Sequence, residues 1–326
     1  MKKGLKIIVP VAGEGTRMRP HTYTVPKPLL PVAGKPVLSH VIDPLTFLEP
    51  EEMIFVIGHL GDQVEEFVKK QYKFPVSFVR QQELLGLGFA IYLALKVVKP
   101  GPLLVVLGDT IAKTDYKEFV KSDRNVIGLK AVKDPRRFGV AVIDNGRIIA
   151  LEEKPQNPKS DLALIGLYYF PDSEVLKLHL GKLVDMGKKT SGEIQLTDAL
   201  EFMLGAGELF KPFIIDGWYD CGKRETILET NRLLLEEMNA FNDYPGSIIV
   251  PPVHISPSAG IEQSIIGPYV TVADGAQVHK SIIRDSIIGR KSVIEHSLIE
   301  QSLVGEKAVV RGSFDRLNIG SSTEIG

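Results

Sequence analysis

Two neighbouring stretches of the sequence decide the fold: Val9-Pro10-Val11-Ala12-Gly13-Glu14-Gly15-Thr16-Arg17-Met18-Arg19-Pro20, and Pro26-Lys27-Pro28-Leu29-Leu30-Pro31-Val32-Ala33-Gly34-Lys35-Pro36-Val37. In the first stretch an apolar strand runs into a glycine loop, where backbone N–H groups can approach an anion. Cationic side chains follow, and they can neutralise phosphate charge without a shift of protonation: Arg17, Arg19, Lys27 and Lys35. We therefore expect a site for the phosphates of a nucleotide.

The loop matches neither of two common phosphate-binding signatures. A P-loop requires Gly-x-x-x-x-Gly-Lys-Ser/Thr, and the dinucleotide fingerprint requires a third glycine where Met18 stands. The longer string Gly-x-Gly-Thr-Arg-x-x-Pro-x-Thr, followed by Pro-Lys-Pro-Leu-Leu-Pro-Val, resembles the signature of the sugar-1-phosphate nucleotidyltransferases. Members of this family join a sugar 1-phosphate to an NTP and release pyrophosphate. Many of them carry one more glycine in the loop. The loop of the present sequence looks more like that of the bacterial UTP:glucose-1-phosphate uridylyltransferases. The loop alone therefore does not identify the base of the nucleotide.

The composition excludes several classes of protein. A formal net charge of -1 and a pI of about 6.7 give no general basic surface for nucleic acid or an anionic membrane. No apolar run approaches the roughly 18 residues that a membrane helix needs. Cys221 is the single cysteine, so a disulfide framework within the chain is excluded and a reducing compartment is the default. We expect a cytoplasmic protein that binds neither nucleic acid nor membrane.

Residues 1–243 are expected to form one α/β domain. Short β-rich apolar runs alternate with segments of helical period: Ile7–Val11, Val37–Phe47, Met53–Ile57, Asp62–Tyr72, Val76–Val79, Gly88–Val97 and Leu103–Leu107. This rhythm predicts a doubly wound sheet. The resemblance implies that the sheet is mixed and Rossmann-like. A helix over Thr226–Asn239 is expected to close the domain.

Residues 244–326 follow a different pattern. The segment from Ser281 to Gly289 recurs sixteen positions later from Ser297 to Gly305, and self-similarity at such a period indicates a solenoid. Aliphatic residues recur every five or six positions: Ile255, Ile261, Ile266, Val272, Val278, Ile283, Ile288 and Val293. This resembles the hexapeptide pattern of left-handed parallel β-helices, and a small β-sandwich is the alternative. A β-helix stacks apolar edges and presents flat faces, so we expect a homo-oligomer.

Two aspartates are candidate metal ligands. Asp109 ends the buried run Leu103–Leu107, and such an aspartate is often only a helix cap or turn residue. Mg²⁺, however, prefers one or two carboxylates together with substrate phosphates, and Asp220 in Trp218-Tyr219-Asp220-Cys221-Gly222 offers a second. The pair resembles the family's Gly-Asp and Trp-x-Asp-Thr-Gly motifs, which implies that Asp109 and Asp220 hold Mg²⁺. The resemblance also implies that Arg17 and Lys27 contact the NTP phosphates and stabilise the departing pyrophosphate.

The resemblance assigns further residues to the nucleotide. The loop residues Ala12, Gly13, Gly15 and Thr16 are expected to surround its phosphates. Gln81 precedes Gly86 by five positions, and a glutamine at this distance reads the edge of a pyrimidine base in the family. An amide offers a donor and an acceptor together, as base recognition requires. An exposed polar loop is the alternative interpretation.

The sugar phosphate is expected to lie against a third set of residues. Glu153-Lys154-Pro155 resembles the family's Glu-Lys-Pro motif, in which the lysine contacts the phosphate and the glutamate the hydroxyls. Three further residues lie in segments that resemble sugar-side motifs: Gly139, Tyr168 and Glu193. Gln195 stands where the family has a second glutamate, which leaves the preferred sugar open.

Together these motifs predict an Mg²⁺-dependent nucleotidyltransferase. The chain resembles long glucose-1-phosphate thymidylyltransferases with a β-helical tail. This resemblance favours dTTP and glucose 1-phosphate as substrates. A UTP:glucose-1-phosphate uridylyltransferase and a mannose-1-phosphate guanylyltransferase are the alternatives. A catalytically silent regulatory or scaffold paralogue is an alternative of another class. Such a paralogue is expected to have lost Arg17, Lys27 or one of the two aspartates, whereas all are present.

Overall fold

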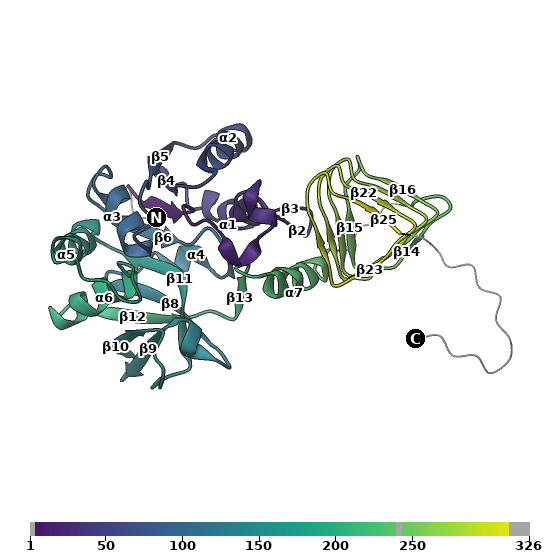
Figure 1. Cartoon of the computed structure of the whole chain (residues 1–326). Helices are drawn as coiled ribbons and strands as arrows, with labels where there is room; N and C mark the ends of the chain where they lie inside the picture. The colour runs from purple at the N-terminus through teal and green to yellow at the C-terminus, as the bar shows by residue number, and fades with distance from the viewer. Residues whose placement is uncertain (1–3, 239–242, 313–326) are drawn as a thin grey trace. The chain divides into compact units, whose positions relative to one another are not determined.

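The computed structural model describes residues 4–238 and 243–312 (Figure 1). Its contacts divide the chain into two compact units, Met1–Leu30 with Pro36–Lys223, and Pro31–Lys35 with Arg224–Gly326. Within the described ranges, no helix is both long and apolar enough to cross a bilayer. The boundary predicted between residues 243 and 244 stays a prediction.

The first unit is built on a mixed nine-stranded sheet with the order β10-β9-β11-β6-β1-β4-β5, in which β8 pairs with β11 and β12 with β8. Parallel pairing of β1 with β4 and β6, and of β4 with β5, forms its centre, while β11 runs antiparallel to β6. The strands are β1 Lys6–Pro10, β4 Glu52–Ile57, β5 Val76–Arg80, β6 Leu103–Val106, β8 Asn125–Ala131, β9 Gly139–Asp144, β10 Arg147–Glu153, β11 Leu162–Phe170 and β12 Phe210–Ile214. The predicted mixed, Rossmann-like sheet is confirmed.

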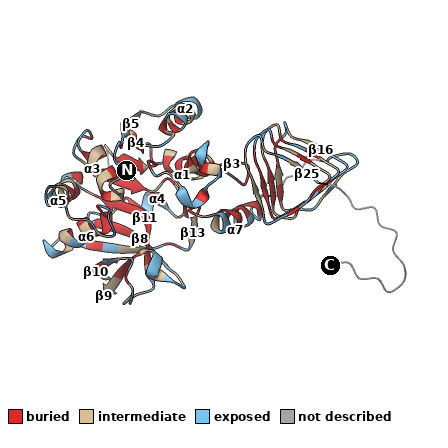
Figure 2. Ribbon diagram, viewed as in Figure 1, coloured by how far each residue is buried: buried red, intermediate tan, exposed pale blue. Residues whose placement is uncertain are grey.

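Both faces of this sheet are covered. Ile8, Ile54 and Val56 lie in a core cluster with the helices α3, α5 and α6. Their neighbours in the same strands, such as Ile7 and Phe55, point to the other face and are also fully buried. The central strands of the sheet are buried in Figure 2. The helices are α1 Val37–Thr46, α2 Gly61–Gln71, α3 Leu87–Leu95, α4 Tyr116–Phe119, α5 Ser173–Asp185 and α6 Leu196–Gly205.

Short strands of the second unit stack into three parallel sheets, as in a parallel β-helix (Figure 1). One sheet contains β14 Ile248–Ile249, β17 Ile265–Ile266, β20 Ile282–Arg284 and β23 Leu298–Glu300. The second contains β15 Val253–Ile255, β18 Val270–Val272, β21 Ile287–Ile288 and β24 Leu303–Val304. The third contains β16 Gly260–Glu262, β19 Gln277–His279, β22 Val293–Glu295 and β25 Val309–Arg311. The predicted β-helix is thus confirmed, and the β-sandwich alternative is excluded.

The recurring aliphatic residues fill the centre of this β-helix. Seven of the eight that the repeat pattern singled out are buried in its core, from Ile255 to Ile288. The eighth position was wrong by one residue, because Ile294 is buried and Val293 pairs with Gln277 on the outer side. The step from Ile288 to Ile294 is six positions, as from Ile266 to Val272, whereas the prediction took a step of five.

Helix α7, Arg224–Leu235, packs against β18 and against the hairpin strand β2, Pro31–Val32. The predicted end at Asn239 was wrong, because the helix ends at Leu235 and residues 236–237 form a turn. Residues 313–326 of the predicted β-helix domain lie outside the described residues. The buried Asn231 connects these parts: its Oδ1 accepts from Ala33 N at 2.9 Å and from Thr271 Oγ1 at 2.6 Å, and its Nδ2 donates to Tyr269 O at 3.3 Å. A single amide therefore joins the hairpin and α7 to the β-helix.

Replacing this amide gives a first prediction. We expect Asn231→Leu to lower the free energy of unfolding by about 2–3 kcal/mol, because it leaves a buried N–H and hydroxyl without their acceptor. Thr271→Val is the matched control and should cost about 1 kcal/mol, since Asn231 keeps its bond from Ala33 N. Urea unfolding of the whole chain, followed by circular dichroism, measures both. Equal losses for the two variants would contradict this account.

Candidate active site

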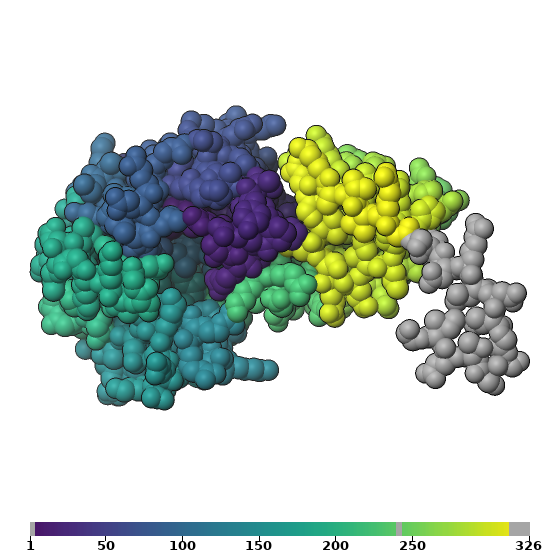
Figure 3. Space-filling model, viewed as in Figure 1, coloured from purple at the N-terminus to yellow at the C-terminus, as the bar shows by residue number. Residues whose placement is uncertain are grey.

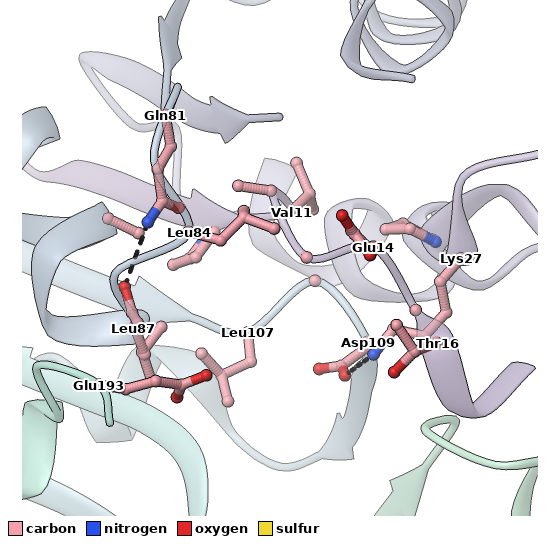
Figure 4. Close-up of a pocket in the computed structure, with 18 of the residues that line it drawn as sticks. Val11, Glu14, Thr16, Lys27, Gln81, Leu84, Leu87, Leu107, Asp109 and Glu193 are labelled. Atoms are coloured by element: carbon pink, nitrogen blue, oxygen red, sulfur yellow. Dashed lines mark hydrogen bonds and ion pairs between the residues drawn. The ribbon is translucent and has the colours of Figure 1, made fainter. Parts of the chain in front are cut away.

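The loop after β1 forms one wall of a hollow of about 490 Å³ in the first unit (Figures 3 and 4). Gly15 has φ +65°, and a Cβ there would lie 2.9 Å from Thr22 Cγ2 and 3.1 Å from Lys27 Cβ. Thr22 Oγ1 also donates to Gly15 O at 2.9 Å. Only glycine fits this position, because a side chain would be strained by the left-handed backbone and crowded by its neighbours. The loop is thereby held in a shape that leaves Gly13 open to the hollow, with nothing within 4 Å of its Cβ position.

The structure brings the predicted phosphate residues to this hollow. They are the loop residues and two cations: Ala12, Gly13, Gly15, Thr16, Arg17 and Lys27. Two other cations of the opening stretches are not among its lining residues. Arg19 is ion-paired to Glu14 at 3.0 Å on the surface, and Lys35 belongs to the second unit. The surface ion pair of Arg19 therefore does not support the expectation that it neutralises phosphate, and the expectation for Lys35 stays a prediction.

Asp109 and Asp220 become neighbours through a small antiparallel sheet. Strand β7, Thr110–Lys113, pairs with β13, Gly217–Asp220, in a register that places Asp220 opposite Thr110. The pairing continues beyond the strands, since Cys221 N donates to Asp109 O at 3.0 Å. The residue before this turn, Gly108, must be glycine, because a Cβ there would collide with Val11 Cγ1. Two distant motifs thus place two carboxylates together at the carboxyl end of β6.

Cations lie against both carboxylates. Lys27 Nζ donates to Asp109 Oδ2, as the dashed line in Figure 4 shows. A Cβ on Gly222 would lie 2.8 Å from Asp220 Oδ1 and 3.1 Å from Arg17 Nη2, so that guanidinium is close to the second carboxylate. Burial opposes the charge of Asp109, but the charge of Lys27 and its hydrogen bond outweigh it and lower the pKa of Asp109. Burial and then the nearby Asp109 charge raise the pKa of Asp220.

This donor set fits Mg²⁺. The described residues contain no group of three or more His, Cys, Asp or Glu side chains that could hold a metal by themselves. Mg²⁺ does not need one, because it is usually held by one or two carboxylates together with water and substrate phosphates. Besides burial, the raised pKa of Asp220 reflects repulsion between the negative charges of Asp109 and Asp220, so a bound cation would stabilise the pair. A metal–triphosphate complex brings that charge and supplies its own oxygen ligands.

The other end of the hollow is less charged. Gln81 is buried and donates from Nε2 to Gly86 O at 3.4 Å, and Gly86 has φ +105° (Figure 4). Leu84, Leu87 and Leu107 line the hollow nearby. An amide edge beside apolar side chains suits the edge and faces of a planar base.

Glu193 lines the same hollow as Gln81 and Gly86 (Figure 4). Gln195 Nε2 donates to Glu193 Oε2 at 3.1 Å. Gly86 must be glycine here, because its Cβ would lie 2.7 Å from Glu193 Cβ. The residue predicted for the sugar side therefore lies beside the residues predicted for the base.

The remaining sugar-side residues form a separate cluster, which does not line this hollow. Thr197 Oγ1 donates to Glu153 Oε2 at 2.6 Å, and Lys154 Nζ lies 3.3 Å from Glu153 Oε1. Burial, and next the charge of Glu153, raise the pKa of the Tyr168 phenol. A Cβ on Gly139 would lie 3.0 Å from Thr197 Oγ1 and 3.1 Å from Glu153 Oε2. The structure thus brings Gly139, Glu153, Lys154 and Tyr168 together, as the sequence predicts.

Sequence reasoning missed two kinds of residue. Thr197 was not among the candidates although it orients Glu153, and its position four residues after Glu193 was the available signal. The apolar wall of Leu84, Leu87 and Leu107 was also missed. Leucines beside a glycine loop are too common in strands and helices to indicate a ligand by themselves.

Comparison with known proteins decides the family. The model of the nucleotidyl transferase family matches residues 6–237. The chain belongs to this family. It is 30% identical to a glucose-1-phosphate thymidylyltransferase from Streptomyces griseus over 320 residues, which cover 89% of the chain and 88% of that protein. It is also 30% identical to a UTP–glucose-1-phosphate uridylyltransferase from Haloferax volcanii over 243 residues, 72% of the chain and 98% of that protein.

A solved structure agrees with this membership of the nucleotidyl transferase family. A putative glucose-1-phosphate thymidylyltransferase from Bacillus anthracis, crystallised with sucrose, superposes with a TM-score of 0.63 at 29% identity. The match covers 73% of the chain and 98% of that protein. The relatives thus agree on the class of reaction and differ in the nucleotide that their names specify.

Proposed function

We propose that this nucleotidyltransferase transfers a nucleotidyl group from dTTP to glucose 1-phosphate and releases pyrophosphate in an Mg²⁺-dependent reaction. A single arrangement carries the proposal: one hollow, which Arg17 also lines, has Lys27 and Asp109 at one end and Gln81 at the other. A nucleoside triphosphate matches this arrangement, because its base lies at one end and its charged phosphates lie at the other. The match with the thymidylyltransferase extends over most of both chains, which favours dTTP and glucose 1-phosphate as the substrate pair.

The reaction is a displacement at the α-phosphorus. A phosphate oxygen of the sugar 1-phosphate forms a bond to that phosphorus, while the bond from the phosphorus to the oxygen bridging to the β-phosphate breaks and pyrophosphate leaves. Little covalent chemistry is required of the protein, so positioning and neutralisation of charge supply the catalysis. Arg17 and Lys27 neutralise charge on the departing pyrophosphate. Asp109 and Asp220 would hold Mg²⁺, which when bound polarises the phosphoryl oxygens.

The acceptor is held by the second cluster. Lys154 attracts the phosphate of the sugar 1-phosphate, and Glu153 accepts hydrogen bonds from sugar hydroxyls. Thr197 donates to one oxygen of Glu153 and so leaves the other to Lys154 and the sugar. The direction of the Glu153 carboxylate is therefore fixed before the sugar arrives.

A substrate screen tests this function. The protein is incubated with Mg²⁺ and each pair of NTP and sugar 1-phosphate, and the released pyrophosphate is measured. We expect dTTP with glucose 1-phosphate to be the fastest pair. A faster rate with UTP would replace thymidylyl by uridylyl transfer, and a preference for GTP with mannose 1-phosphate would favour the guanylyltransferase alternative. No release with any pair would favour a catalytically silent paralogue.

The glutamine at the base end gives a second prediction. We expect Gln81→Leu to lower kcat/KM for the preferred NTP by about 10- to 100-fold, mainly through KM, because it removes a donor and an acceptor facing the base. Gln82→Leu is the matched control on the neighbouring exposed residue and should change kcat/KM by less than about twofold. Initial rates of pyrophosphate release at varied NTP concentration measure both. If the two variants behave alike, Gln81 does not read the base.

A further inference from the structure

A second hollow, of about 490 Å³, lies in the first unit apart from the candidate active site. Three segments of the chain line it: residues 121–124 before β8, residues 145–147 at the turn between β9 and β10, and residues 209–211 at the start of β12. None of these residues lines the hollow that contains Lys27 and Asp109. We call this second site the basic hollow, because cations prevail among its charged residues.

The register of the sheet places the basic hollow at the end opposite Asp109. Tyr169 of β11 pairs with the second residue of β6 and with the second residue of β8, so these two strands begin at the same end. β12 also begins there, because it pairs with β8 in parallel. Asp109 follows the other end of β6. Arg147 begins β10 and Glu153 ends it, so the sugar-side cluster lies about 20 Å along that strand from the basic hollow.

The basic hollow gathers positive charge in a chain whose formal net charge is -1. Four cations and one carboxylate are among its lining residues: Lys121, Arg124, Arg147, Lys211 and Asp123. Lys121 is paired with Glu118 at 2.7 Å. Within the part of the chain that the structure describes, the side chains of the other three cations have no ion pair or hydrogen bond. Like charges around one hollow repel each other, and a bound anion would remove that repulsion.

Two of these cations stand on strands that the core holds in place. Ile148 of β10 and Phe210 of β12 are buried in the same core cluster. Their neighbours in the two strands, Arg147 and Lys211, therefore point away from the core. Both are exposed and line the basic hollow. The two charges are thus carried by a rigid part of the fold.

The loops that complete the hollow have defined shapes. Asn145 and Gly146 have φ +47° and +73°, as the central residues of a tight hairpin turn require, and Arg147 follows them directly. In the loop before β8, Arg124 N donates to Ser122 Oγ at 3.0 Å. The backbone therefore brings the third cation to the same hollow.

Linked phosphate groups match this set of donors. Arginine binds phosphate oxygens through parallel N–H groups, and lysine binds them as a point charge. Three unpaired cations are balanced by an anion of about three or more negative charges, whereas a single phosphate monoester carries at most about two. Nucleic acid needs an extended basic surface, and this site is one hollow of a size that suits a small molecule.

We propose that the basic hollow binds a linear oligophosphate, a chain of two or more phosphate groups, through Arg124, Arg147 and Lys211. Inorganic polyphosphate and the phosphate chain of a nucleotide both offer this chemistry. Phe210 is the aromatic residue among those lining the hollow, and it is only 2% exposed, so the base of a nucleotide gains little there. The proposal does not rest on the proposed reaction, because the two sites share no lining residue.

A label beside the hollow tests the proposal without any turnover. Leu209 lines the hollow and is 43% exposed, whereas Cys221 is buried, so Leu209→Cys can be labelled selectively with a trifluoromethyl group. The labelled full chain is titrated with inorganic tripolyphosphate, and fluorine NMR follows the label. We expect a saturable shift of the signal with a dissociation constant below about 1 mM.

Variants of the labelled chain identify the cations that bind. Arg147→Gln and Arg124→Gln should each weaken tripolyphosphate binding by about tenfold or more, because each removes a charge-assisted hydrogen bond. Lys70→Gln is the matched control, an exposed cation on α2, which packs on β4 and β5 at the other edge of the sheet. It should bind like the labelled parent, and circular dichroism should show all variants folded. No shift of the label up to about 10 mM tripolyphosphate, or equal weakening by Lys70→Gln and Arg147→Gln, overturns the proposal.

Other ligands test the chemical class and its source. Orthophosphate, glucose 1-phosphate and citrate should bind at least about tenfold more weakly than tripolyphosphate. Equally tight binding of orthophosphate or citrate overturns the proposal, because one phosphate group or a tricarboxylate would then suffice. An NTP and long-chain inorganic polyphosphate are compared in the same way. Tighter binding of the NTP assigns the site to nucleotides and tighter binding of polyphosphate assigns it to inorganic chains, and either order supports an oligophosphate site.

Discussion

The Asp109→Asn variant is expected to release pyrophosphate at least about a thousandfold more slowly than the wild type. Asparagine keeps the size and one oxygen of the side chain but removes the negative charge that faces Lys27 and neighbours Asp220. In the proposed mechanism that charge holds Mg²⁺ at the triphosphate, and the remaining carboxylate cannot replace it. The loss should appear in kcat, because neutralising the phosphate charge stabilises the transition state more than it stabilises the bound substrate.

The matched control for this variant is Asp216→Asn. Asp216 is exposed next to β13, and its carboxylate lies 3.8 Å from Lys130 Nζ. The same change of charge at that position should alter the rate by less than about twofold. Circular dichroism should show both variants folded, so that a lost rate reports on chemistry. Undiminished activity of Asp109→Asn would remove Asp109 from the proposed metal site.

Local patterns predict the elements that carry the site. β6 consists of four fully buried aliphatic residues, so its end and the place of Asp109 follow from the run Leu103–Leu107. The strand β1 and its glycine loop follow in the same way. These predictions succeed because a strand buried on both faces must be apolar at every position.

Long-range pairings could not be predicted from spacing. The approach of Asp220 to Asp109 depends on the register between β7 and β13, and only the resemblance to the family indicated it. The place of Glu193 beside Gly86 depends on the packing of two loops, in which Ile194 N donates to Leu85 O at 2.7 Å. Such contacts are decided by tertiary packing, which a single sequence does not encode as a local pattern.

The Lys27→Met variant is expected to lose catalysis and to gain affinity for a divalent cation. Pyrophosphate release should fall by about a hundredfold or more, because a fixed cation no longer faces the departing group. However, Lys27 Nζ also donates to Asp109 Oδ2, where a metal would bind. Like charges about 4 Å apart repel by several kcal/mol at the effective dielectric constant of such sites. Removing Lys27 should therefore tighten binding of Mn²⁺, a paramagnetic substitute for Mg²⁺, by about tenfold or more.

Electron paramagnetic resonance of Mn²⁺ measures this affinity without any turnover. Lys121→Met is the matched control, because Lys121 is exposed, pairs with Glu118 at 2.7 Å and carries the same charge. Its affinity for Mn²⁺ should equal that of the wild type. Asp109→Asn should bind Mn²⁺ more weakly, so two variants that both lose activity are expected to shift metal affinity in opposite directions. A general loss of folding cannot produce that opposition, and unchanged Mn²⁺ affinity in Lys27→Met would show that Lys27 does not compete with a metal for Asp109.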